Sequence, residues 1–175
     1  GDAYYMTRTG YYATGYYAKS DGSYSYEQDH QFTSYADLCS KYGVNINTKS
    51  TTIDIYAQWA PKTVKVIFNK NDGSGNTANQ SFTYAESGNR FGYNRDGTPK
   101  WGNNSGQFGA WDRTGYTLLG WSESPSATTA TYSIYSNVSD SWINSKVPDP
   151  NASGTVNLYA VWKLYAKIVI VPIEP

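Results

Sequence analysis

The chain has 175 residues, enough for one large or two small domains, and its 14 basic residues balance 14 acidic ones. A net charge of zero gives no electrostatic basis for binding nucleic acid or inserting into an anionic membrane. The single cysteine excludes a disulfide framework within the chain, and no apolar run reaches the ~18 residues of a membrane helix.

Four elements are predicted in the first part of the chain. Residues 1–17 resemble a strand pair broken by glycines, and residues 23–26 alternate serine with tyrosine as a half-buried strand does. Residues 34–42 place apolar side chains at helical spacing, and Gly43 then predicts the end of that helix. Residues 51–59 alternate again and predict a strand.

The middle of the chain predicts a hairpin and a long excursion. Residues 63–68 alternate apolar and polar side chains, 69–77 are a polar Gly/Asn/Asp turn, and 80–84 form the predicted return strand. Residues 86–112 are rich in Gly, Asn and aromatics. So long a connection is expected to contain small hairpins, for example around residues 94–97.

The last part of the chain predicts strands around a second helix. Strands are expected at residues 116–121, 131–135 and 155–162, and a short helix is marked by Val138, Trp142 and Ile143. Residues 166–171 follow Trp162 as residues 63–68 follow Trp59, and predict a further strand.

Two separate strings recur along the chain. Arg8–Tyr16 corresponds to Arg113–Trp121, and Thr52–Trp59 corresponds to Thr155–Trp162, with nearly the same separation in both cases. A fixed separation between two different strings indicates an internal repeat. The tryptophans at these positions, among them Trp59, Trp121 and Trp162, are predicted to lie in the core.

The repeat predicts an α+β, strand-dominated fold of tandem units, each a small mixed sheet packed on one short helix. Residues 1–60 would be a partial unit, and residues 61–163 a complete unit with an insertion at 86–112. Residues 164–175 would open a following unit. Alternatively, strand 166–171 would complete the sheet of the partial unit, whose edges would otherwise be open.

These strings resemble the Listeria–Bacteroides repeat, also seen as the B repeats of internalin-type surface proteins. The resemblance rests on Val64–Phe68 with its following turn, on Arg113–Trp121 and on Leu158–Trp162. It implies a β-grasp-like fold and an extracellular, non-catalytic spacer or adhesion module of a bacterial surface or secreted protein, with neighbouring repeats as partners. The sequence departs from the pattern at Tyr16, where the second copy has Trp121, and in the length of the insertion.

The insertion supplies the candidate ligand site. Flat aromatic rings beside amides can stack on a sugar and bond its hydroxyls, so a carbohydrate-binding module for a polysaccharide or cell-surface glycan is the alternative function. The residues concerned are Tyr93, Trp101, Phe108, Trp111, Asn103, Asn104 and Gln107. The competing interpretation is a loop that packs over its own aromatics.

No catalytic set, cofactor motif or metal cluster is found, and the chain is expected not to be an enzyme. His30 is the only histidine, and residues 72–76 have the composition of a turn rather than of a calcium loop. A glycoside-cleaving carboxylate pair such as Asp96 and Asp112 stays open. Lys65 and Lys167 are expected to point outward from their strands, although crosslinking to an asparagine is the alternative.

Overall fold

The computed structural model describes residues 7–18, 36, 40, 55–100 and 111–165, and strands dominate it. The first described sheet has two antiparallel strands, β1 (Tyr11–Ala18) and β2 (Ile55–Pro61). In the described part of the chain these two strands pair only with each other.

The second sheet is mixed and has four strands in the order β4-β3-β6-β5. Its strands are β3 (Thr63–Asn69), β4 (Thr77–Thr83), β5 (Tyr116–Ser122) and β6 (Ser153–Leu164). β3 runs parallel to β6, and the other neighbours are antiparallel. The one complete helix in the described residues, α2 (Asp140–Lys146), precedes β6 and serves as the crossover that a parallel pair requires.

The strongly alternating segments were predicted correctly. The strands expected at residues 63–68, 80–84, 116–121 and 155–162 are confirmed, each slightly longer than predicted. The short helix is confirmed too, and Ser139 caps it by accepting a hydrogen bond from the Trp142 backbone N–H at 3.2 Å. Ser139 thus supplies the start signal of α2.

Two predicted strand regions differ from the structure. Residues 7–18 contain a turn and the single strand β1, not a strand pair, because Gly10 takes a positive φ of 78° while Gly15 lies within the strand beside a bulge. Residues 131–135 form only an isolated bridge at Tyr132. The Trp121 carbonyl accepts from both Thr131 and Tyr132 N–H groups, so no ladder continues from it.

Several predictions lie outside the described residues. They concern the strand at 23–26, most of the helix at 34–42 and the strand at 166–171, together with His30, Cys39 and Lys167. The proposed pairing of strand 166–171 with the partial unit therefore stays a prediction, as do the domain boundaries.

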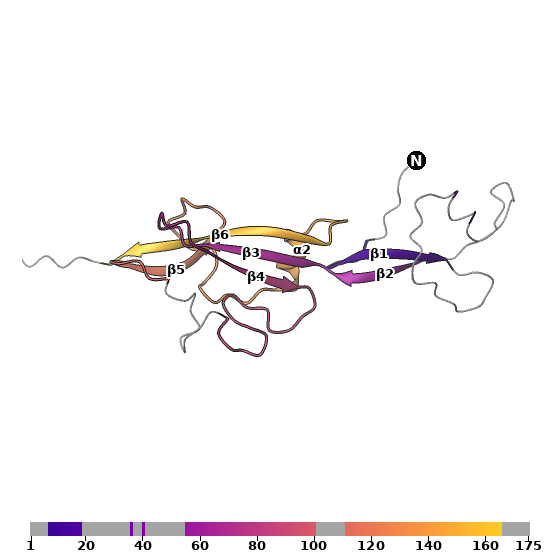
Figure 1. Cartoon of the computed structure of the whole chain (residues 1–175), viewed down its shortest axis with the longest axis horizontal. Helices are drawn as coiled ribbons and strands as arrows, with labels where there is room; N and C mark the ends of the chain where they lie inside the picture. Colours follow the sequence, from indigo (N-terminus) through magenta and orange to yellow (C-terminus); the bar gives the residue numbers. More distant parts are fainter. Residues whose placement is uncertain (1–6, 19–35, 37–39, 41–54, 101–110, 166–175) are drawn as a thin grey trace, which may run out of the picture.

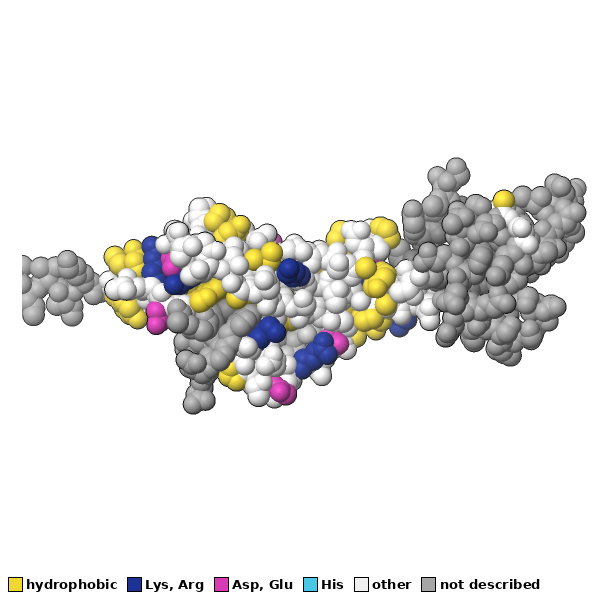
Figure 2. Space-filling view, in the orientation of Figure 1, with side chains coloured by type: hydrophobic (Ala, Val, Ile, Leu, Met, Phe, Trp, Pro, Cys, Tyr) yellow, Lys and Arg dark blue, Asp and Glu magenta, His cyan; other side chains and the backbone are white. Residues whose placement is uncertain are grey.

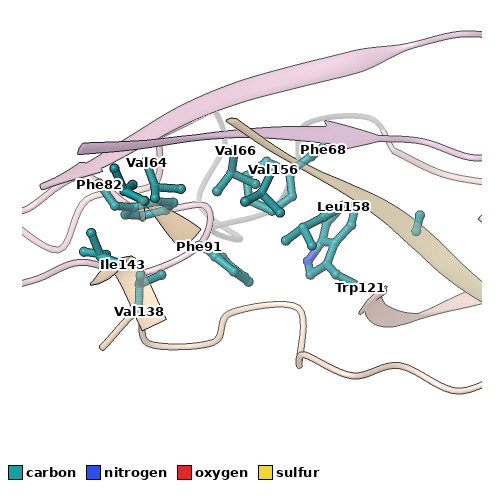
Figure 3. Packing of buried hydrophobic residues seen from close by; sticks show 12 residues of the cluster. Val64, Val66, Phe68, Phe82, Phe91, Trp121, Val138, Ile143, Val156 and Leu158 are labelled. Carbon is teal, nitrogen blue, oxygen red and sulfur yellow. The ribbon is translucent and has the colours of Figure 1, made fainter. Parts of the chain in front are cut away.

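The core lies between one face of the four-stranded sheet and α2 with the loops beside it (Figure 3). Alternation along β3 turns three side chains inward, Val64, Val66 and Phe68, all fully buried. Trp121 from β5 packs edge-on against Phe68, with ring centroids 4.8 Å apart. The remaining buried side chains of this cluster are Phe82, Phe91, Val138, Ile143, Val147, Val156, Leu158 and Ala160.

The pair β1–β2 repeats the pair β5–β6 residue by residue. Tyr11 faces Pro61 as Tyr116 faces Leu164, and both pairs then carry the same bulge, between Ala13 and Gly15 and between Leu118 and Gly120. Beyond the bulge, Tyr16–Ala57 corresponds to Trp121–Ala160. The recurring strings therefore have the same backbone pairing.

The two sheets lie end to end (Figure 1). β2 ends at Pro61 and β3 begins at Thr63, so a single residue, Lys62, joins strands that belong to different sheets. Pro61 lacks an N–H and suits the end of a strand. Because the connection is only one residue long, the contacts around Lys62 determine the orientation of one sheet relative to the other.

Candidate functional site

The predicted glycan platform is only partly described. Trp101, Asn103, Asn104, Gln107 and Phe108 lie outside the described residues. Tyr93 and Trp111 are described, but they line separate hollows. Each ring packs edge-on against another aromatic, Tyr93 against Tyr135 at 5.4 Å and Trp111 against Trp121 at 5.5 Å. These two rings therefore do not form a flat pair facing solvent.

The described part of the insertion is fastened to the sheet by Gln80. Its buried amide donates to the carbonyls of Arg90 and Tyr93 at 2.9 and 2.8 Å, and its oxygen accepts from the Gly92 N–H at 2.9 Å. A buried amide satisfied on both sides holds a loop in one conformation. The small hairpin predicted around residues 94–97 is present as a single antiparallel bridge between Tyr93 and Pro99, inside which the Asn94 N–H donates to the Thr98 carbonyl.

An aromatic hollow of about 270 Å³ lies beside the ends of β5 and β6 farthest from Lys62. Its lining includes five aromatic side chains, Trp111, Tyr116, Tyr135, Trp162 and Tyr165. Figure 2 shows apolar side chains at this end of the described surface, with charged ones beside them, and further apolar patches along the molecule toward β1 and β2. Leu164 and Tyr165 are 61% and 60% exposed there.

The joint between the sheets is a second concentrated set of contacts, built around the side chain of Lys62, which is only 1% exposed. Its Nζ donates to the Val147 carbonyl at 2.8 Å and to Asp149 Oδ1 at 2.6 Å, and lies 3.4 Å from Asn144 Oδ1. Val147 ends α2, where the helix dipole favours a cation. Lys62 thus fastens the connection between the sheets to the end of the helix.

Backbone hydrogen bonds complete the joint. Lys62 N–H donates to the Gly10 carbonyl, and Tyr84 N–H donates to the Lys62 carbonyl, both at 2.9 Å. The Gly10 N–H donates to Asn144 Oδ1 at 2.8 Å, and the ring of Tyr84 covers Gly10 so closely that a Cβ there would lie 2.1 Å from it. Only glycine fits this position, both for its φ and for its space.

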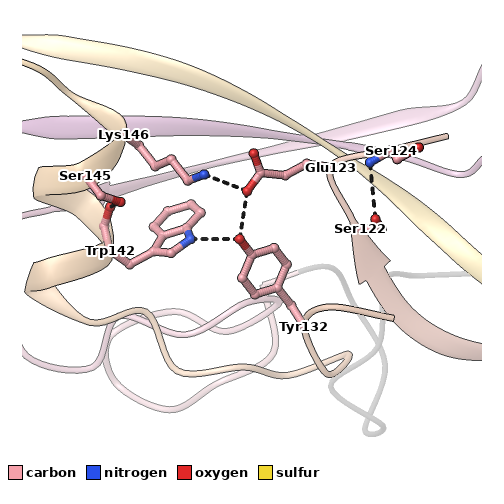
Figure 4. A network of polar contacts seen from close by, with 7 residues as sticks. All are labelled: Ser122, Glu123, Ser124, Tyr132, Trp142, Ser145 and Lys146. Atoms are coloured by element: carbon pink, nitrogen blue, oxygen red, sulfur yellow. Dashed lines mark hydrogen bonds and ion pairs between the residues drawn. The ribbon is translucent and has the colours of Figure 1, made fainter. Parts of the chain in front are cut away.

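A polar network links α2 to the loop after β5 (Figure 4). Glu123 Oε1 accepts from Lys146 Nζ at 2.6 Å and from the Tyr132 hydroxyl at 2.7 Å, while Trp142 Nε1 donates to that hydroxyl at 3.1 Å. The bonds from Lys146 and then Tyr132 lower the pKa of Glu123, and burial raises the pKa of Tyr132. The network fixes the helix against the loop.

Replacing Glu123 by glutamine is expected to make stability less dependent on pH. A lowered folded-state pKa means that the Glu123 carboxylate stabilises the fold above its unfolded-state pKa and stops doing so as pH falls through the folded-state value. The loss at neutral pH should stay within about 1 kcal/mol, because the side chain is 46% exposed.

Urea unfolding of Glu123→Gln and of the parent across a pH series measures this effect. The two stability curves should converge in acid and separate toward neutral pH. Lys146→Met should produce a similar separation, and curves that run parallel throughout would contradict the assignment.

Other site types have no support in the described residues. No group of three or more His, Cys, Asp and Glu side chains gathers there as a metal site would require, and no helix there is long and apolar enough to cross a membrane. Asp72 accepts hydrogen bonds from the Ser74 hydroxyl and N–H, which confirms a turn at residues 72–76. Lys65 is exposed on β3, as predicted.

The sequence interpretation placed a unit boundary between residues 60 and 61 but did not single out the buried lysine beside it. Lysine is almost never fully buried, so its position in the sequence gave no reason to single it out. The repeat gives no signal for it either, because Tyr165 stands at the position that matches Lys62. Comparison with family models, with curated proteins and with solved structures gives no match for this chain.

Proposed function

We propose that this chain is a non-catalytic, extracellular spacer or adhesion module of a bacterial surface or secreted protein, built from tandem units of the Listeria–Bacteroides repeat type. Under this proposal each complete unit is a β-grasp-like sheet packed on a short helix, and its mechanical role is to hold neighbouring units at a fixed distance and angle. The joint at Lys62 is the observation that carries it.

A rigid spacer needs a connection that neither bends nor twists. Here the connecting strand passes from one sheet to the other through one residue. That residue makes backbone hydrogen bonds to both sides and its buried ammonium bonds to the end of α2. Flexible linkers, in contrast, are several residues long and rich in glycine and serine. The joint therefore suits a rigid array of units better than units joined by flexible linkers.

The repeated pairing supports the same proposal. The residues around Gly10 and around Gly115 have the same register and bulge, so both strand pairs offer the same backbone geometry to a following unit. Repeats that contact only their neighbours form extended arrays of this kind. Near-zero net charge and a surface with few charged groups also suit a structural rather than an ion-binding part.

Distance measurements between spin labels test the rigidity that this function requires. With Cys39 replaced by serine, cysteines at Gln58 and Lys163 place one label on each sheet, and a pair at Ser81 and Lys163 lies within one sheet. We expect distance distributions of equal width for the two pairs. A pair of glycines inserted between Pro61 and Lys62 should broaden only the distance distribution of the Gln58–Lys163 pair. A broad distribution across the intact joint would reject the rigid-spacer function.

A further inference from the structure

The chain carries the same structural feature twice, at Gly10 and at Gly115. Both glycines have a positive φ, 78° and 81°. Each is preceded by an arginine whose guanidinium lies over the next tyrosine ring, Arg8 over Tyr11 at 4.1 Å and Arg113 over Tyr116 at 3.9 Å.

The residues that follow β2 and β6 also correspond. The Gly10 carbonyl accepts from the Lys62 N–H, and the Gly115 carbonyl accepts from the Tyr165 N–H, both at 2.9 Å. The two strand-pair ends therefore present one geometry, with Lys62 in one and Tyr165 in the other.

The surroundings of the two glycines differ. Tyr84 covers Gly10 and packs edge-on against Tyr11 with ring centroids 5.3 Å apart, and Asn144 Oδ1 accepts from the Gly10 N–H. At Gly115, no atom of the described chain lies within 4 Å of where a Cβ would be. Leu164 and Tyr165, at the positions that Pro61 and Lys62 hold at the first joint, are among the most exposed large apolar residues described.

We propose that the Gly115 end, made of Arg113, Gly115, Tyr116, Leu164 and Tyr165, is a docking surface for a third unit of the same fold, which we call the Gly115 socket. The occupant would place the ring that corresponds to Tyr84 over Gly115, and the helix amide that corresponds to Asn144 on the Gly115 N–H. This proposal rests on the proposed function, because it names the partner of the spacer.

Two observations favour a repeat unit over any other occupant. The established joint shows that a unit of this fold covers the equivalent surface, so the Gly115 socket continues an interface already present in the chain. In the sequence, residues 166–171 follow Tyr165 as Thr63–Phe68 follow Lys62, and four consecutive apolar residues, 168–171, give this segment the composition of a further strand. Because Tyr165 replaces Lys62, the new joint would be apolar and would bury Tyr165 in place of an ammonium group.

The test extends the chain by one unit, with residues 1–165 followed by a second copy of residues 63–165 in place of 166–175. Gly115→Ala is then compared in the natural and the extended chain. The substitution strains φ in both, but only in the extended chain should the new Cβ meet an aromatic ring. We expect an extra loss of melting temperature of about 4 °C or more in the extended chain.

A matched control and a second readout keep the test interpretable. Gly97 has a φ of 80° and an open Cβ position, and it lies in a turn outside the socket. Gly97→Ala should therefore lower the melting temperature equally in both chains. Hydrogen exchange of the Gly115 amide should slow in the extended chain toward that of the Gly10 amide. Carrying Tyr84→Ala in the appended copy alone should remove the extra loss at Gly115.

Two outcomes would overturn the Gly115 socket. One is an equal effect of Gly115→Ala in both chains with an unprotected Gly115 amide. The other is retardation of the 175-residue chain in polysaccharide gels that Trp111→Ala abolishes and the appended unit does not. That result would assign the aromatic hollow, whose lining shares Arg113, Tyr116 and Tyr165 with the socket, to a glycan. Narrow spin-label distances across Lys62 alongside either outcome would leave the spacer function standing while rejecting the socket.

Discussion

Replacing Phe91 by alanine is expected to lower the free energy of unfolding by about 3–5 kcal/mol, because it empties a central position of the core. Phe91 belongs to the insertion, yet it is only 1% exposed. Its ring packs edge-on against Phe68 at 5.2 Å and tilted against Phe82 at 5.7 Å. The segment that follows β4 thus contributes to the core of the four-stranded sheet as well as to the surface.

Equilibrium unfolding in urea measures this loss. Phe91→Leu, which keeps most of the volume, should cost less than about 1.5 kcal/mol and remain folded if the alanine variant does not. Lys100→Ala, an exposed substitution in the same insertion, should change stability by no more than about 0.5 kcal/mol. A Phe91→Ala variant as stable as Lys100→Ala would mean that the insertion does not contribute to the core.

The strands were predictable because their sequence signals are periodic. Strict alternation in residues 63–68 placed Val64, Val66 and Phe68 on one face, and the structure buries all three. The recurring strings predicted that β1–β2 and β5–β6 would correspond, and their pairing registers agree. Patterns of this kind depend only on which face of a strand meets the core.

The insertion was not predictable in the same way. Its position in the fold depends on Gln80, one polar residue on a strand, which bonds to three backbone groups about ten residues further along the chain. Neither a spacing rule nor a propensity connects such partners. Phe91 was consequently overlooked, whereas Tyr93 and Trp111 were grouped as a platform that the described structure does not bring together.

The strand expected at residues 131–135 failed for a related reason. Its composition favours a strand, but Tyr132 contributes its hydroxyl to the network with Glu123 and Trp142, and its backbone meets only Trp121. Gly120 lets this segment approach, since a Cβ there would lie 2.2 Å from the Tyr132 carbonyl oxygen. Tertiary contacts overrode local propensity at this point.

Replacing Lys62 by methionine is expected to lower the free energy of unfolding by about 1–3 kcal/mol and to loosen the joint between the sheets. Methionine keeps most of the side-chain volume but cannot donate a hydrogen bond. The buried Val147 carbonyl would lose its bond from Nζ, and an unsatisfied buried acceptor costs about that much. Asp149 is partly exposed and can turn to water, so its share of the loss should be smaller.

Lys65 provides the matched control, because it is an exposed lysine three residues further along the chain, on β3. Lys65→Met should leave stability within about 0.5 kcal/mol of the parent. Spin labels at Gln58 and Lys163 should report a wider distance distribution for Lys62→Met than for Lys65→Met, even in buffer without denaturant. Equal stability and equally narrow distance distributions in the two variants would show that the ammonium group does not hold the joint. The rigidity of the joint would then have to come from the backbone bonds of Gly10 and Tyr84 alone.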